Sequence, residues 1–380
     1  MRRRSLMSQE NNARTRVALL FGGRSPEHAV SCVTAAGILR VLDPAKYEVV
    51  PIGITRQGQW TITEADPESW SLSSGSTPEI EPSGESLQLA RTNGGSELIG
   101  HSSTGAFRSL GSVDVVFPVL HGSFGEDGTV QGLLELADIP YVGSGVAASA
   151  IGMDKHFAKL AFDAAGLEVG PYEVITDKQW RRDRERCLRR VGRLAYPLFV
   201  KPARAGSSVG VSRVADEAGL VEAIEAAREH DPKIIIEEGI AGREIECGVL
   251  EGRGSDLPRT SLPGEIAVTA GADTFYDFNA KYVDGGAAEL SCPADLPAAQ
   301  VTAIRDQAAA AFDAIGGEGL ARVDFFYTTD GRWVINEINT MPGFTPISMY
   351  PRIWGETGIA YAELVDELIW LALNRPTGLR

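Results

Sequence analysis

The chain has 380 residues, 43% of them hydrophobic and 23% charged, which fits a globular protein with roughly two or three domains. Its formal net charge of −15 argues against binding of nucleic acid or an anionic membrane through bulk electrostatics. No apolar run reaches the length of about 18 residues that a membrane span requires. We therefore expect a cytoplasmic protein with no nucleic-acid or membrane partner.

Residues 1–15 begin with MRRR but lack the apolar segment of a secretory signal, so a disordered tail is predicted there. The cysteines are far apart and match no metal-binding spacing, which predicts reduced, mostly buried thiols. They are Cys32, Cys187, Cys247 and Cys292.

An α/β domain is predicted over residues 16–143. A strand at 16–21 ends in two glycines and is followed by a helix at 26–42, which is how an open α/β sheet begins. Ligands usually bind at the carboxyl ends of such strands, where Glu27 lies, although capping of the helix explains this residue equally well. Residues 64–112 are rich in Ser, Gly, Pro and Glu, which predicts a surface insertion of short hairpins and mobile loop.

Two further strands are predicted at 113–120 and 139–142. His121 follows the first of them, as a site residue or a structural hydrogen-bonding group. The second precedes GSGVAA, which matches a dinucleotide-binding fingerprint and opens a helix that runs to about residue 165. The acidic residue of that fingerprint belongs at the end of the next strand, whereas Asp163 falls inside this helix, so nicotinamide binding is poorly supported.

A smaller unit is predicted over residues 144–238. A strand at 196–200 runs into KPARAGSSVG, where a lysine and exposed backbone N–H groups can hold phosphate. A flexible hairpin tip explains the glycines but not Lys201 at the end of the strand. The strand at 233–238 ends in Glu237 and Glu238, which could contact an adenine, with Glu244 near the ribose, although spacing alone favours a solvated acidic tip.

The last unit, residues 239–380, contains two features of interest. Strands at 264–270 and 287–293 enclose a long loop with Tyr276, Lys281 and Tyr282, which predicts a lid that closes over phosphates. In the segment TMPGFTPISMY that follows residue 339, Gly343 could offer a backbone N–H to an oxyanion.

RVDFFYTTDGRWVINEIN, residues 322–339, predicts a β-hairpin whose two-residue turn is Asp330-Gly331. That turn places Asp324 opposite Glu337 and Arg322 opposite Asn339, all on one face. Two facing carboxylates and an amide suit a hard divalent cation. A cluster of salt bridges made by the arginine is an equally good interpretation of the hairpin alone.

Several motifs in this order resemble those of D-alanine:D-alanine ligases of the ATP-grasp superfamily, from about residue 16 to the C-terminus. They are GGRSPEHAVS, LHGSFGEDGTVQG, SGVAASAIGMDK, VKPARAGSSVG, FYDFNAKY, RVDFF and NEINTMPGFTPIS. The resemblance implies an ATP-grasp fold with an N-terminal open α/β domain, a small central α/β domain and a larger C-terminal α+β domain.

The resemblance also implies roles for individual residues. ATP would be bound by Lys155, Lys201, Ser207, Ser208, Glu237, Glu238, Ile240, Glu244 and Lys281. Two Mg²⁺ ions, with Mn²⁺ as a substitute, would be bound by Asp324, Glu337 and Asn339. The D-alanine substrates would be held by Glu27, His121, Ser348 and Met349, and the reaction assisted by Glu27, Ser207, Tyr282, Arg322, Gly343 and Ser348.

The implied activity is ATP-dependent ligation of two D-alanine molecules through an acyl phosphate, for peptidoglycan synthesis, by a homodimer. Tyr282 favours D-alanine as the second substrate, since some relatives that use D-lactate carry Phe there. Ligases with D-lactate or D-serine as acceptor, an NAD-dependent oxidoreductase and a silent nucleotide-binding module are the alternatives. A silent module would lack at least one of the phosphate-binding lysines or metal ligands. All of them are present in the sequence: Lys155, Lys201, Asp324, Glu337 and Asn339.

Overall fold

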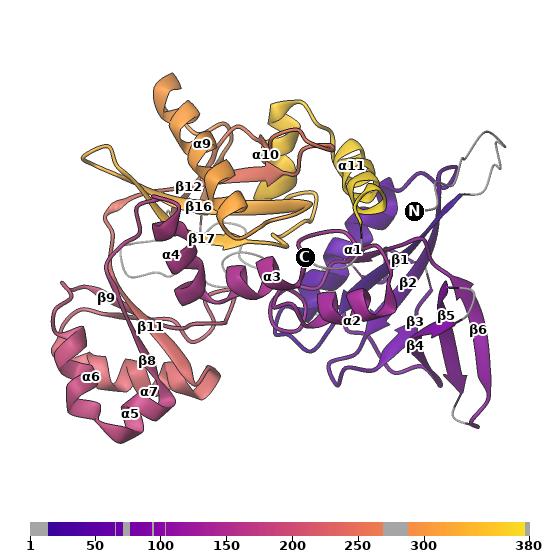
Figure 1. Cartoon of the computed structure of the whole chain (residues 1–380), viewed down its shortest axis with the longest axis horizontal. Helices are drawn as coiled ribbons and strands as arrows, with labels where there is room; N and C mark the ends of the chain where they lie inside the picture. Colours follow the sequence, from indigo (N-terminus) through magenta and orange to yellow (C-terminus); the bar gives the residue numbers. More distant parts are fainter. Residues whose placement is uncertain are drawn as a thin grey trace, which may run out of the picture.

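The computed structural model describes residues 14–64, 66–70, 77–92, 95–102, 104–268 and 288–376. The strands of this part of the chain form four sheets. Figure 1 shows the sheets and their helices gathered into lobes that follow one another along the sequence. The predicted mixed α/β architecture is therefore confirmed.

The first lobe is built on a sheet with strand order β3-β2-β1-β7. Its elements are β1 (Thr15–Gly22), α1 (His28–Val41), β2 (Tyr47–Ile54), β3 (Trp60–Ile62), β7 (Val115–Pro118) and α2 (Thr129–Ala137). Strand β1 pairs in parallel with both β2 and β7, and its apolar side chains are fully buried. Gly22 ends β1 with φ +87°, and a Cβ there would lie 2.4 Å from the carbonyl oxygen of Ile54, so the turn toward α1 requires glycine.

The predicted strand at 139–142 is wrong in extent. Only Tyr141 bridges to the sheet, opposite Val116. Pro140 precedes it and has no backbone N–H, which limits the ladder at this position.

The predicted insertion does contain short hairpins: β4 (Glu85–Thr92), β5 (Gly95–Ser102) and β6 (Phe107–Ser112) form a separate antiparallel sheet.

The central lobe has an antiparallel sheet with strand order β10-β9-β11-β8. Its elements are β8 (Tyr172–Thr176), α5 (Asp177–Arg182), α6 (Arg184–Val191), β9 (Leu198–Pro202), β10 (Ser212–Val214), η1 (Glu217–Gly219), α7 (Leu220–His230) and β11 (Lys233–Glu238). Helices α5 and α6 are separate because the Asp183 side chain caps α6 by accepting the backbone N–H of Arg186 at 2.9 Å.

The C-terminal lobe has the largest sheet, with strand order β15-β14-β12-β16-β17 and β13 paired with β12. Its elements are β12 (Gly242–Leu250), β13 (Arg259–Thr260), β14 (Gly264–Val268), β15 (Ala288–Ser291), α9 (Ala298–Ala314), β16 (Leu320–Thr328), β17 (Trp333–Asn339), α10 (Met349–Thr357) and α11 (Tyr361–Asn374). Ile304, Ala308 and Phe312 lie at helical spacing and form the buried stripe of α9.

One hydrophobic core joins the first and last lobes. The same buried cluster contains Ile38 of α1, Leu368 of α11 and Phe344, which precedes α10. Figure 1 shows α11 beside α1, although they come from opposite ends of the chain. This shared core holds the segment around residue 343 against the first lobe, close to the turn that carries Glu27.

The hairpin of β16 and β17 has the predicted pairs but a different turn. Arg322 lies opposite Asn339, and Asp324 opposite Glu337. The turn is one residue longer than predicted, because Thr328 accepts the N–H of Gly331 and pairs with Arg332. A bulge after Asp324 shifts the register back by one residue, so the two differences cancel at the polar end.

The helix predicted to run from the GSG turn to about residue 165 is also interrupted. It is divided into α3 (Val146–Met153) and α4 (Lys155–Ala164) at Asp154. The Asp154 carboxylate accepts the backbone N–H groups of His156 and Phe157 and therefore caps α4. Figure 1 shows α4 between the central lobe and the C-terminal sheet.

Candidate active site

A cavity of about 630 Å³ lies where the three lobes meet. Every predicted site residue in the described part of the chain lines it. Lys281 and Tyr282 lie outside the described residues, so their predicted roles are not addressed by the structure. Residues that are up to about 320 positions apart in sequence, from Glu27 to Met349, therefore surround one space.

The polar end of the β16–β17 hairpin forms an ion-pair cluster. Arg322 donates to both carboxylate oxygens of Asp324 at 2.7 Å, and its Nε lies 3.2 Å from Glu246 Oε1 on β12. The Asn339 amide also donates to Asp324, at 3.1 Å. Burial would lower the pKa of Arg322, but the two carboxylates outweigh it and hold that pKa well above its usual range. The salt-bridge alternative is thus present in the structure.

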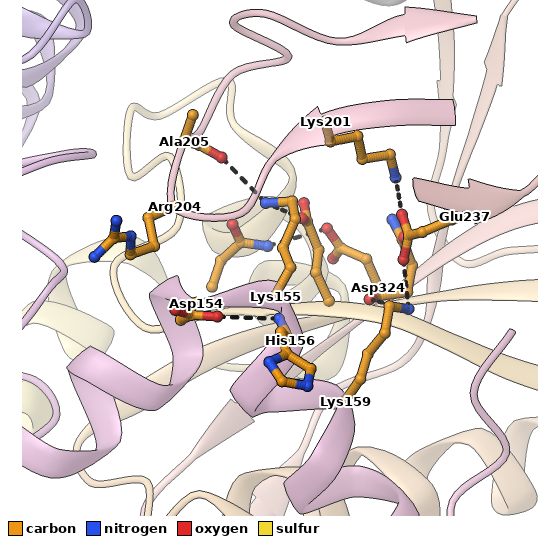
Figure 2. Close-up of polar contacts among 12 residues, drawn as sticks. Asp154, Lys155, His156, Lys159, Lys201, Arg204, Ala205, Glu237 and Asp324 are labelled. Carbon is orange, nitrogen blue, oxygen red and sulfur yellow. Dashed lines mark hydrogen bonds and ion pairs between the residues drawn. The ribbon is translucent and has the colours of Figure 1, made fainter. Parts of the chain in front are cut away.

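The second carboxylate of the hairpin is paired with α4. Lys155 Nζ lies 3.1 Å from Glu337 Oε2 and donates to the carbonyl oxygen of Ala205 at 3.1 Å (Figure 2). Burial disfavours the charge on Lys155, but Glu337 more than compensates and raises the lysine pKa. Within the described residues no three His, Cys, Asp or Glu side chains form a metal cluster; the hairpin offers two carboxylates and the Asn339 amide.

A buried carboxylate at the end of β11 lies between two lysines. Figure 2 shows Lys159 of α4 and Lys201 of β9 approaching Glu237 from opposite sides. Their Nζ atoms lie 2.8 and 2.5 Å from its two oxygens. Burial would raise the pKa of Glu237, but the two ammonium charges lower it well below its usual range. Glu237 is therefore ionised and is not the solvated acidic tip that spacing alone favoured.

The loop after β9 reaches the first lobe. The Ser207 hydroxyl donates to Glu27 Oε1, and both Ser207 and Ser208 have positive φ angles, 47° and 58°. Consecutive left-handed residues that are not glycine are uncommon and cluster at functional sites. The hydrogen bond between Ser207 and Glu27 joins the predicted phosphate loop to the predicted substrate residue.

His121 and Glu126 connect the first lobe to the segment before Gly343. His121 Nδ1 donates to the carbonyl oxygen of Met341 at 3.0 Å, and the Met341 N–H donates to Glu126 at 3.2 Å. The Thr34 hydroxyl and His121 Nε2 are hydrogen-bonded at 3.1 Å. Burial lowers the pKa of His121, whereas burial and the charge of Glu27 raise the pKa of Glu126 to about 8.

The far ends of the cavity hold the remaining predicted residues. Glu238 accepts the backbone N–H of Ala195 at 2.8 Å, and Ile240 and Glu244 line the cavity near it. At the other end Ser348 bonds to Thr345, with 2.7 Å between the hydroxyls, immediately before α10. Met349 is the first residue of α10 and is buried.

Sequence reasoning missed four charged residues that line the cavity: Lys159, Glu126, Glu246 and Arg352. A signal existed for Lys159, because it follows Lys155 by four residues and so lies on the same helical face. Glu126 lies within the quoted LHGSFGEDGTVQG motif. Glu246 could be found only from the pairing of β12 with β16, which places it opposite Asp324.

Comparison with known proteins gives a consistent result. A family profile described as D-ala D-ala ligase N-terminus matches residues 16–144, and one described as D-ala D-ala ligase C-terminus matches residues 161–370. A D-alanine–D-alanine ligase of Arthrobacter sp. (strain FB24) is 63% identical over 369 residues, 97% of each chain. One of Streptomyces coelicolor is 52% identical over 96% of this chain and 95% of its own.

Solved structures agree with the sequence relatives. The VanG D-Ala:D-Ser ligase from Enterococcus faecalis has a TM-score of 0.78 at 35% identity, and covers 95% of this chain and 100% of its own. The D-alanine-D-alanine ligase from Coxiella burnetii has a TM-score of 0.77 at 34% identity, with coverages of 95% and 94%. The predicted fold class is therefore confirmed.

The lobes and the lysine-lined cavity between them define an ATP-dependent ligase with the ATP-grasp fold. The chain belongs to the D-alanine–D-alanine ligase family. The activity of that family is the ADP-forming ligation of D-alanine to D-alanine, which supplies peptidoglycan synthesis. The NAD-dependent alternative is wrong, and Asp163 indeed lies inside α4. No helix among the described residues is long and apolar enough to span a membrane.

Proposed function

We propose that the enzyme joins two D-alanine molecules within this cavity through an acyl phosphate, using residues of all three lobes. The observation that supports this most directly is the hydrogen bond from Ser207 to Glu27, which places a phosphate-loop residue on a first-lobe carboxylate. In this proposal Glu27 binds the ammonium group of the first D-alanine, and His121 completes the same subsite. Tyr282 of the predicted lid would close this subsite.

The nucleotide occupies the space between the central and C-terminal lobes. Lys155 and Lys201 bind the α- and β-phosphates, while Lys281 reaches the γ-phosphate. The N–H groups around Ser207 and Ser208 cover the triphosphate. Adenine and ribose are bound by residues at the end of β11 and just after it, which are Glu237, Glu238, Ile240 and Glu244. This assignment is supported by the lysine ammonium groups that line the cavity.

The hairpin cluster fits a divalent cation. Asp324, Glu337 and Asn339 carry oxygen donors on two facing strands, the ligand type that Mg²⁺ prefers. We assign these side chains to two Mg²⁺ ions, with Mn²⁺ as a substitute. Bound there, the ions would neutralise charge on the phosphates. Occupation of this site would take over the charge pairing that Arg322 and Lys155 now provide.

The reaction has two chemical steps. A carboxylate oxygen of the first D-alanine attacks the γ-phosphorus of ATP, and ADP leaves. The amine of the second D-alanine then attacks the acyl carbon, and inorganic phosphate leaves from a tetrahedral intermediate. Arg322 and the N–H of Gly343 stabilise the negative charge on oxygen. A guanidinium has five N–H donors, so the bonds of Arg322 to Asp324 leave donors for the substrate.

The second D-alanine binds at the start of α10. Its carboxylate is received by Ser348 and the backbone at Met349, because a helix N-terminus attracts anions. The attacking amine must be deprotonated, so dipeptide formation should rise with pH. D-alanine is proposed as the acceptor on the basis of the family activity and the predicted role of Tyr282.

Coupled measurement of ADP release tests this proposal. D-alanine with Mg-ATP should support turnover, whereas L-alanine should not. D-serine and D-lactate, each offered as acceptor with D-alanine as the first substrate, should be used more slowly than D-alanine. Absence of D-alanine-dependent ADP release would overturn the proposal, and faster use of D-lactate at neutral pH would overturn the acceptor assignment.

Other expectations remain proposals. They are the domain limits 16–143, 144–238 and 239–380, a tail at 1–15, a homodimer and a cytoplasmic location. Sedimentation of the purified enzyme at several concentrations would test the homodimer.

A further inference from the structure

Lys159 is a buried cation to which the proposed reaction gives no task. Its side chain is only 4% exposed, and its Nζ lies 2.8 Å from Glu237 Oε1. The same ammonium donates to the carbonyl oxygen of Asn336 at 3.4 Å. Asn336 is the bulged residue of β17, so Lys159 connects the end of β11 to the hairpin of the C-terminal lobe.

Two ammonium groups therefore share one carboxylate. Lys201 contacts the other oxygen of Glu237, at 2.5 Å (Figure 2). One close cation already offsets the loss of hydration of a buried carboxylate, so the second lysine adds a positive charge beyond what Glu237 requires. The surplus has a use if one of the two lysines leaves Glu237 when a ligand binds.

The structure distinguishes the lysine that stays from the one that can leave. Lys159 extends from the middle of α4 and is held at a second point by the Asn336 carbonyl. Lys201 is more accessible, at 17% exposed, and lies where β9 opens into the loop that carries Ser207. The contacts of Lys159 are thus fixed by two lobes, whereas Lys201 borders the cavity.

We propose that Lys159 is a positioning residue: it is the stationary counter-ion of Glu237 that allows Lys201 to transfer from this carboxylate to the phosphates of ATP. The inference rests on the proposed role of Lys201 as a phosphate ligand. Lys159 itself does not contact the reacting atoms.

The energetic consequence falls on the ATP complex and not on the free enzyme. Without Lys159, the free enzyme still has Lys201 to neutralise Glu237. When ATP binds, Lys201 has two options in this variant. It can remain with Glu237 and fail to contact the phosphates, or it can move to the phosphates. The second option leaves Glu237 buried without a close cation, which is strongly unfavourable. Loss of Lys159 should therefore weaken nucleotide binding selectively.

Lys159→Met is the primary test, with steady-state kinetics on the full chain. We expect the KM for ATP to rise at least tenfold, about 1.4 kcal/mol. The KM for D-alanine and the thermal midpoint of the free enzyme should change little. Lys178→Met, an exposed lysine of α5, is the matched control and should leave all of these values unchanged. A KM for ATP within twofold of the parent would overturn the inference, and so would failure of Lys159→Met to fold.

A second variant separates this role from simple structural damage. Adding Glu237→Gln to Lys159→Met removes the negative charge that lacks a cation, while the amide of Gln keeps an oxygen that can accept from the adenine, so the double variant should bind Mg-ATP more tightly than Lys159→Met alone. No recovery would contradict the inference.

Lys201→Met separates the inference from the proposed function. If its KM for ATP is unchanged, the phosphate role of Lys201 fails, and the role of Lys159 fails with it. If Lys201→Met is impaired but Lys159→Met is not, only the inference about Lys159 fails.

Discussion

Replacing Glu337 with Gln tests whether the carboxylate patch of the hairpin serves catalysis or stability. Glu337 is 29% exposed, and it forms an ion pair with Lys155 at 3.1 Å. The amide of Gln keeps the size of the side chain and one oxygen acceptor for Lys155, but it loses the negative charge. The substitution therefore removes the charge of a proposed metal ligand while disturbing the surrounding packing very little.

The two effects differ in size. A pair of this exposure contributes about 1 kcal/mol, and the retained hydrogen bond reduces the loss. For a chain of 380 residues, about 1 kcal/mol lowers the melting temperature by roughly 1–2 °C. Loss of an anionic ligand that supports charge neutralisation in the transition state costs about 3 kcal/mol, or roughly 100-fold in kcat. The catalytic effect should thus exceed the effect on stability.

The assay is ADP release over a series of Mg²⁺ concentrations, with the melting temperature measured on the same samples. Glu265→Gln is a suitable control. Glu265 of β14 is 18% exposed and forms an ion pair at 2.6 Å with Arg243 of β12. This variant should lose comparable stability with no change in Mg²⁺ dependence. If Glu337→Gln unfolds, or turns over normally at every Mg²⁺ concentration, the metal assignment is wrong and the hairpin cluster is structural.

Three further predictions concern the same cavity. Ser207→Ala removes the bond to Glu27 and should raise the KM for the first D-alanine about tenfold, measured by kinetics at saturating ATP. Arg322→Lys loses the paired donors to Asp324 and should lower kcat about 100-fold at nearly constant melting temperature. Folded Glu126 keeps its proton until about pH 8, whereas the unfolded chain releases it near 4.5, so the parent loses stability as pH rises between these values. Glu126→Gln should therefore become progressively more stable than the parent across that range in thermal melts, and a constant difference would refute the raised pKa.

The sequence predicted most strands and helices, and its errors have local causes. The hairpin prediction reached the right facing pairs from an incorrect turn. A turn one residue longer and a bulge after Asp324 shift the register in opposite directions, so Asp324 still faces Glu337. Neither irregularity has a sequence signature that period-two alternation detects. The break at Asp154 was missed because the apolar pattern continues on both sides of it.

Side-chain partners were much harder to predict than positions. The described residues that motif resemblance selected line one cavity. The resemblance did not reveal that Lys201 contacts Glu237 or that Lys159 shares that carboxylate. These contacts depend on how α4, β9 and β11 approach one another, and each belongs to a different part of the sequence.

In the structure, the cations assigned to ATP and to the oxyanion are each held by a carboxylate. Lys155 is paired with Glu337, Arg322 with Asp324, and Lys201 with Glu237. Such pairing avoids repulsion among positive charges before ATP arrives, because each buried ammonium or guanidinium has a neutralising neighbour. In the proposed reaction, divalent cations at the hairpin would relieve Lys155 and Arg322 of their carboxylates. Among the residues that the structure describes, no cluster of metal ligands lies beside Glu237, and this difference is the physical reason we propose for its second lysine.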